Sequence, residues 1–187
     1  MSWFQPAHKQ PGMDASAVLP DGPLKLISAC HAHTLQQCAD LRRLVRHLES
    51  FGCDAQARQL GRQVLEYFDA AAFQMHAEEE GFLFPALLES SAGLDAATLR
   101  EMISGMTRQH RVLEQLWQSL RDRLLMIANA GSGVLCSAEV EAFVRPLEQN
   151  IDGEDNKLLP MVSRLFTDCE LASVRKAGFA VGAVHRH

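Results

Sequence analysis

Four residues that can bind a metal ion, His31, Glu79, His110 and Glu154, occupy positions where the sequence otherwise places apolar side chains. Each belongs to a different stretch of apolar residues with helical spacing. A carboxylate at such a position is costly unless it is paired or bound to a cation. Four helices that bring two carboxylates and two imidazoles to one interior can hold iron, zinc or manganese. The pattern therefore favours a metal site inside an all-helical protein.

Each of these residues also has a simpler explanation. A lone histidine on an apolar stripe is more often a hydrogen-bonded core residue than a ligand, and Glu79 lies in a run of three glutamates that an exposed helix face would explain. Considered together, Glu79 and Glu154 would face each other across the interior and repel, and a cation between them would remove that conflict. The surface is the expected place for five other histidines, which lie off the stripes or near the chain ends: His8, His33, His47, His185 and His187.

The elements that position these residues are four amphipathic helices, because apolar residues recur at three- and four-residue steps. The predicted helices span about 23–50, 54–89, 95–130 and 137–165. Pro23 suits a first helical turn, and Asp95 and Ser137 are expected N-caps. Kinks or helix ends are expected at the three later prolines, which are Pro85, Pro146 and Pro160.

Short connections between four long helices predict an all-α, antiparallel up-down four-helix bundle over residues 21–167. Residues 1–20 are polar and aperiodic, which predicts a flexible N-terminal extension, and residues 168–187 are expected to add a short C-terminal helix and a tail. An internal similarity supports the bundle, because Glu79 and Glu154 each lie six residues before a proline in related segments.

Composition excludes several classes of protein. The chain has 187 residues, 47% hydrophobic and 22% charged, as expected for one globular domain with a tail. A net charge of −5 without a basic cluster argues against nucleic-acid binding. Five cysteines without a CxxC spacing favour reduced thiols in a cytoplasmic protein. Neither a secretory signal nor an apolar run long enough for a membrane span is visible.

These motifs resemble the hemerythrin-like (HHE cation-binding) family over about residues 22–167. That family has one histidine on the first helix and one on the third, with His-x-x-x-Glu and a Leu-Phe-Pro segment on the second and fourth. The matching segments here are Ala-Cys-His31, Met-His-Ala-Glu-Glu-Glu-Gly-Phe-Leu-Phe-Pro (75–85), Arg-Gln-His110-Arg, and Asn-Ile-Asp-Gly-Glu-Asp-Asn-Lys-Leu-Leu-Pro (150–160).

Two of the usual ligand histidines are replaced, by Met75 and Asn150, which regular helical spacing places on the inner faces with Glu79 and Glu154. Histidine and glutamate four residues apart lie on one helix face and can reach one ion. Methionine is a soft ligand that is mismatched to iron among carboxylates, and asparagine offers a neutral oxygen. His76, which has its own four-residue spacing to Glu80, is the candidate substitute. Whether the face of His76 and Glu80 or that of Glu79 points inward stays open.

The resemblance implies a metal-binding protein with a sensing, redox or metal-handling role, and a mononuclear or dinuclear site for iron or, alternatively, zinc. The predicted ligands are His31, His76, Glu79, His110 and Glu154. Family members are implicated in oxygen binding, nitric-oxide response and iron or redox sensing, and the loss of two imidazoles disfavours reversible oxygen carriage. A small diatomic ligand and a homo-oligomer fit this hypothesis. The alternative is a metal-free bundle that acts as a regulatory or interaction module, and a di-iron oxidase would need a substrate pocket that the sequence does not show.

Overall fold

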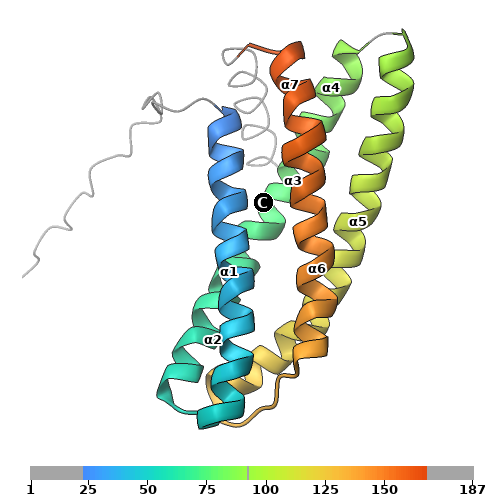
Figure 1. Ribbon diagram of the computed structural model, residues 1–187. Helices are drawn as coiled ribbons and strands as arrows, with labels where there is room; N and C mark the ends of the chain where they lie inside the picture. The colour runs from blue at the N-terminus through green and yellow to red at the C-terminus, as the bar shows by residue number, and fades with distance from the viewer. Residues whose placement is uncertain (1–22, 92, 168–187) are drawn as a thin grey trace, which may run out of the picture.

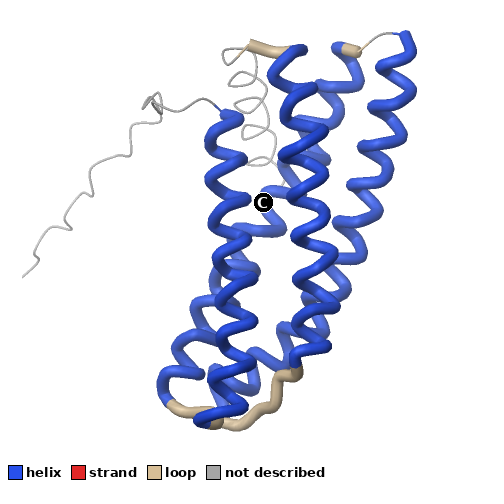
Figure 2. The backbone as a smooth tube through the Cα atoms, in the orientation of Figure 1, coloured by secondary structure: helices blue, strands red, loops and turns tan. Residues whose placement is uncertain are grey.

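The computed structural model describes residues 23–91 and 93–167. Within these ranges the chain forms helices joined by short loops and contains no strand (Figure 2). The all-α prediction is therefore confirmed. The predicted N-terminal extension and the predicted C-terminal helix and tail lie outside the described residues.

The helices lie along four rods (Figure 1). In the element names below, η denotes a wide π-helical turn. Rod 1 is α1 (Pro23–Phe51). Rod 2 joins α2 (Ala55–Tyr67), η1 (Phe68–Ala72), α3 (Phe73–Glu78), η2 (Glu79–Leu83) and α4 (Phe84–Ser90). Rod 3 joins α5 (Gly93–Leu125) and η3 (Met126–Ala130), and rod 4 joins α6 (Ser137–Gly153), η4 (Glu154–Leu158) and α7 (Leu159–Leu165).

Each rod packs against its two neighbours in an antiparallel bundle, and rods 2 and 4 also touch at one end. Helix α1 contacts α2 and α6, and α5 contacts the same two helices from the other side. At one end of the bundle, α4 contacts α5 and α7. The short connections force consecutive rods to run in opposite directions, as the ribbon in Figure 1 shows. Among the described residues, no helix combines the length and apolar content that crossing a bilayer requires.

Two predicted helix starts differ from the observed ones. Helix α5 begins at Gly93, so Asp95 lies inside its first turn rather than before it. The N-cap of α6 is Cys136, not Ser137, because Glu139 lies three residues after Cys136 and completes a reciprocal cap. The Glu139 backbone N–H donates to Cys136 Sγ over 3.4 Å, and the Cys136 N–H donates to Glu139 Oε2 over 3.2 Å.

The prolines act differently from one another. Helix α6 continues through Pro146 to Gly153, so the expected break there is absent. The buried side chains that flank it, Val144 and Leu147, hold this part of the helix in the core. Pro85 and Pro160 lie in the first turns of α4 and α7, directly after the π-helical turns η2 and η4.

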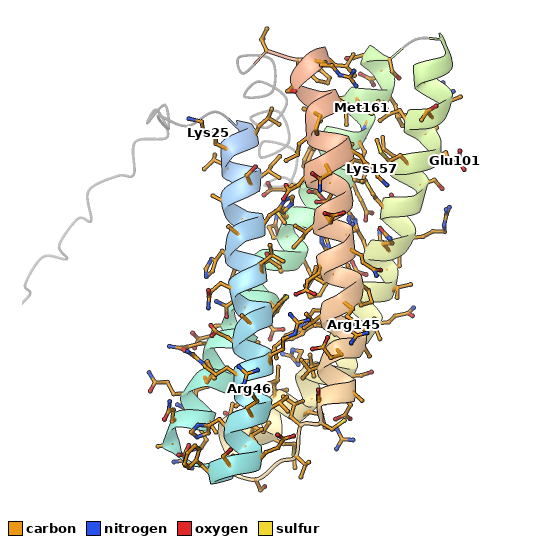
Figure 3. All side chains as sticks on the ribbon, in the orientation of Figure 1. Lys25, Arg46, Glu101, Arg145, Lys157 and Met161 are labelled. Atoms are coloured by element: carbon orange, nitrogen blue, oxygen red, sulfur yellow. The ribbon has the colours of Figure 1, made fainter. Side chains whose placement is uncertain are left out.

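The interior contains two separate apolar clusters. The larger one includes Leu41, Leu113 and Phe143. The smaller one, near the other end of the bundle, includes Phe84, Met106 and Leu158. Charged side chains cover the outside, as the labelled Arg46, Glu101 and Lys157 show in Figure 3.

Candidate metal centre

A layer of buried polar side chains lies between the two apolar clusters, and all four rods contribute to it. Along α1, for example, His31 lies between Leu24, which packs against the smaller cluster, and Cys38 of the larger one. Along α5, His110 lies between Met106 and Leu113 in the same way. The polar layer consists of His31, His76, Glu79, His110, Asn150 and Glu154, each no more than 3% exposed. All five predicted ligands are thus buried at one level of the bundle.

The functional atoms of four of these residues lie close together. His31 Nε2 is 3.0 Å from Glu154 Oε2, and His110 Nε2 is 3.5 Å from Glu154 Oε1. Glu154 therefore presents one carboxylate oxygen to each imidazole. His110 Nε2 also lies 3.7 Å from Glu79 Oε2. One potential ligand atom from each of His31, Glu79 and Glu154 lies within 4.8 Å of the other two, a spacing that a single ion can bridge.

His76 joins this layer through its contact with His110. The two rings stack with centroids 3.9 Å apart and an interplanar angle of 2°. In the middle of rod 2 the buried positions run from Phe68 to Ala72, His76 and Glu79, and a five-residue step across the wide turn η2 then leads to Phe84. His76 and Glu79 thus share the inner face of rod 2.

Met75 does not lie on that inner face, which corrects the sequence-based expectation. Its half-buried side chain lines a different cavity of about 290 Å³, together with Leu26, Ala29, Cys30, His33 and Tyr67. The expectation assumed regular α-helical spacing through residues 64–83. The turns η1 and η2 break that regularity, because a π-helical turn holds more residues than an α-helical one.

Glu80 and Asp155 contact the second ring nitrogen, Nδ1, of His110 and His31, respectively. Glu80 Oε1 accepts a hydrogen bond from His110 Nδ1 over 2.8 Å, and Asp155 Oδ1 accepts one from His31 Nδ1 over 2.7 Å. Such a contact fixes the ring orientation and makes the other ring nitrogen a better donor to a metal. This role of Glu80 and Asp155 was not predicted from the sequence. The available signal was the acidic residue that directly follows each inward glutamate.

The π-helical turns η2 and η4 explain how two acidic residues that are adjacent in the sequence contact different side chains. In η2 the Phe84 N–H donates to the Glu79 carbonyl, and in η4 the Leu159 N–H donates to the Glu154 carbonyl. The following prolines have no N–H, and their rings would crowd the carbonyl four residues earlier in a regular helix. A wide turn relieves this crowding. Such turns often occur at functional sites.

The polar layer contains several buried atoms without a hydrogen-bond partner among the described residues. They are His31 Nε2, His76 Nδ1, Glu79 Oε2, His110 Nε2, Asn150 Oδ1 and Glu154 Oε1. Each buried polar group without a hydrogen-bond partner lowers the stability of the fold by about 1–3 kcal/mol. Nitrogen and carboxylate oxygen atoms with free lone pairs are the donors that iron and zinc accept. The residues present therefore fit a bound cation.

The protonation of the layer also follows from its burial. Burial raises the pKa of Glu79 well above its usual value, and the negative charge of Glu154 raises it further. Burial acts in the same direction on Glu154, but the neighbouring imidazoles of His110 and His31 outweigh it and lower the pKa of that carboxyl. Burial, followed by the nearby His110, lowers the pKa of His76 to about 3. Glu154 and His76 are thus held in the forms that bind metals, whereas the raised pKa of Glu79 favours its protonated form in the absence of a cation.

Comparison with known proteins agrees with this geometry. A model of the hemerythrin HHE cation binding domain matches residues 22–162. The chain is also 26% identical over 133 residues to a protein of Haemophilus influenzae (strain ATCC 51907 / DSM 11121 / KW20 / Rd) described as uncharacterized, covering 71% of this chain and 74% of the relative. The family match covers the four helical rods almost completely, so the chain belongs to the hemerythrin HHE cation-binding domain family.

Proposed function

We propose that this domain binds iron in a mononuclear or dinuclear site between Glu79 and Glu154, and that occupancy of the site serves a sensing, redox or metal-handling role. The observation that carries the proposal is the group of buried nitrogen and oxygen atoms without hydrogen-bond partners in the polar layer described above. A bound cation would satisfy these atoms together. Membership of a cation-binding family supports the same function.

The ligands in this proposal are His31, His76, Glu79, His110 and Glu154. The two oxygens of Glu154 lie near different histidines, which suits a carboxylate that bridges two ions. The close approach of His31, Glu79 and Glu154 equally suits a single ion. A mixture of imidazole and carboxylate donors is well matched to iron, and zinc is the alternative. Iron in such a centre would supply redox chemistry and a position for a small diatomic ligand.

The competing function is a metal-free bundle that regulates or binds another protein. The raised pKa of Glu79 favours this alternative, because a proton shared between Glu79 and Glu154 could replace a cation. In that case the partly satisfied polar layer would be a structural feature of the bundle. The two functions make opposite predictions about metal content.

Metal analysis of protein purified without chelator tests the proposal. We expect one or two iron or zinc ions per chain, retained after gel filtration. A Glu79→Gln and Glu154→Gln double variant should lose this metal, because it removes both carboxylates between which the ion lies. A matched His33→Ala variant should retain it, because His33 is exposed and lies outside the layer. Wild-type protein that stays metal-free after incubation with iron(II) or zinc would favour the metal-free module.

A further inference from the structure

Asn150 is a buried polar residue that none of the predicted ligand positions includes. Its side chain is 1% exposed, and its Oδ1 has no hydrogen-bond partner among the described residues. Asn150 precedes Glu154 by four residues, and α6 is regular up to Gly153, so both side chains lie on one face of rod 4. An apolar side chain at this position would avoid the cost of an unpaired amide oxygen.

The orientation of the amide leaves its oxygen available. Asn150 Nδ2 donates to Gln109 Oε1 on α5 over 3.5 Å, a long hydrogen bond that uses the nitrogen end of the amide. Gln109 directly precedes His110, so this contact ties Asn150 to the rod that carries one of the proposed ligands. The unpaired Oδ1 is therefore the end of the amide that is free to bind a cation in the polar layer.

We propose that Asn150 Oδ1 is a neutral oxygen donor of the metal centre, and that it shifts the metal preference away from Zn²⁺ and toward oxygen-preferring cations such as Mn²⁺ and Fe²⁺. This inference rests on the proposed metal-binding function. Imidazole suits zinc and copper, whereas carbonyl oxygens suit manganese and magnesium. An asparagine in place of a histidine therefore changes the selectivity of the site.

The replaced position on rod 2 adds no sulfur ligand to the layer. The Met75 side chain lines the separate cavity with Cys30 and His33, so neither of these two sulfur atoms is part of the polar layer. Met75 therefore does not counteract the effect of an additional oxygen.

Competition titrations with Mn²⁺ and Zn²⁺ at one fixed pH test the inference. In Asn150→His, the Zn²⁺ affinity should rise by at least about tenfold and the Mn²⁺ affinity should change by less than about threefold. In Asn150→Leu, the Mn²⁺ affinity should fall by about tenfold because an oxygen donor is lost. The matched control is Asn156→His, which places the same side chain on an exposed position of rod 4, where both affinities should stay within about twofold.

The outcomes separate this inference from the proposed function. If the wild type binds metal but Asn150→His changes both affinities by the same factor, or neither, Asn150 is not a donor and the inference is wrong. An unchanged Mn²⁺ affinity in Asn150→Leu would overturn it equally. If the wild type binds neither of these metals nor iron(II), the proposed function itself fails. Should Asn150→Leu not fold, the ratio of affinities in Asn150→His still decides the question.

Discussion

Without its cation, the bundle should be less stable at pH 7.5 than at pH 5.5. The cause is Glu79, whose pKa is raised by burial and by the charge of Glu154. In the metal-free fold this carboxyl releases its proton at a higher pH than in the unfolded chain, where it ionises above about pH 4.3. Between these two pKa values the folded state binds more protons, and stability falls by about 1.4 kcal/mol per pH unit. The upper limit of this contribution between pH 5.5 and 7.5, reached when Glu79 stays protonated throughout, is about 2.7 kcal/mol.

His76 acts in the opposite direction. Its pKa of about 3 keeps it neutral in the fold, whereas in the unfolded chain it gains a proton below about pH 6.5. This favours the unfolded chain by about 1.4 kcal/mol at pH 5.5. Glu154 and Asp155 raise the pKa of His31 against the effect of burial. This shift stabilises the fold at low pH, and the stabilisation is lost as the pH rises above about 6.5. At the upper limit for Glu79, the loss that remains at pH 7.5 after the effect of His76 is about 1.3 kcal/mol, or roughly 3–5 °C in melting temperature for a domain of this size.

Thermal melts followed by circular dichroism, with chelator or with excess iron or zinc, measure this effect. An ion at a hundred times its dissociation constant should add about 2.7 kcal/mol at pH 7.5, or roughly 5–10 °C. The gain should be smaller at pH 5.5, because protons compete for the ligands.

A Glu79→Gln variant is the control for this experiment. With chelator present, it should lose the fall in stability toward pH 7.5, because the group that releases the proton is absent. The reasoning is refuted if chelated wild-type protein melts at the same or a higher temperature at pH 7.5 than at pH 5.5. A melting temperature that added iron or zinc does not raise at pH 7.5 would refute the metal site as well.

Further predictions concern the surroundings of the site. Glu80→Gln and Asp155→Asn should each weaken metal binding by about 10–100-fold in a chelator competition, because the histidine rings lose their orienting partner. The exposed Glu66→Gln should have no effect in the same assay, and equal affinities for all three variants would contradict this role. Met75→His alone should leave the metal content unchanged by elemental analysis, because Met75 lines the separate cavity, and increased iron would place it at the centre. Leu113→Ala should destabilise the protein by about 2–5 kcal/mol in urea unfolding, because Leu113 is fully buried in the larger apolar cluster.

The sequence was sufficient to predict the four-helix fold and the burial of His31, Glu79, His110 and Glu154. Apolar periodicity determines which face of a helix is buried, and short loops determine that neighbouring helices are antiparallel, so both properties are local in the chain. His31 and His110 lie on regular helices, and their burial followed directly from their position on an apolar stripe. Cys136 was missed as an N-cap because serine is the more usual capping residue and was preferred at the neighbouring position.

The tertiary structure decided which face of rod 2 carries the site and how the histidines are held. The wide turns η1 and η2 shift the helix phase so that His76, rather than Met75, shares the inner face with Glu79. Periodicity assumes one hydrogen-bond pattern along a helix, so it cannot reveal a change to a wider turn. The contacts of Glu80 with His110 and of Asp155 with His31 join residues from different rods. Such contacts depend on how the rods pack, and no spacing within a single helix determines them.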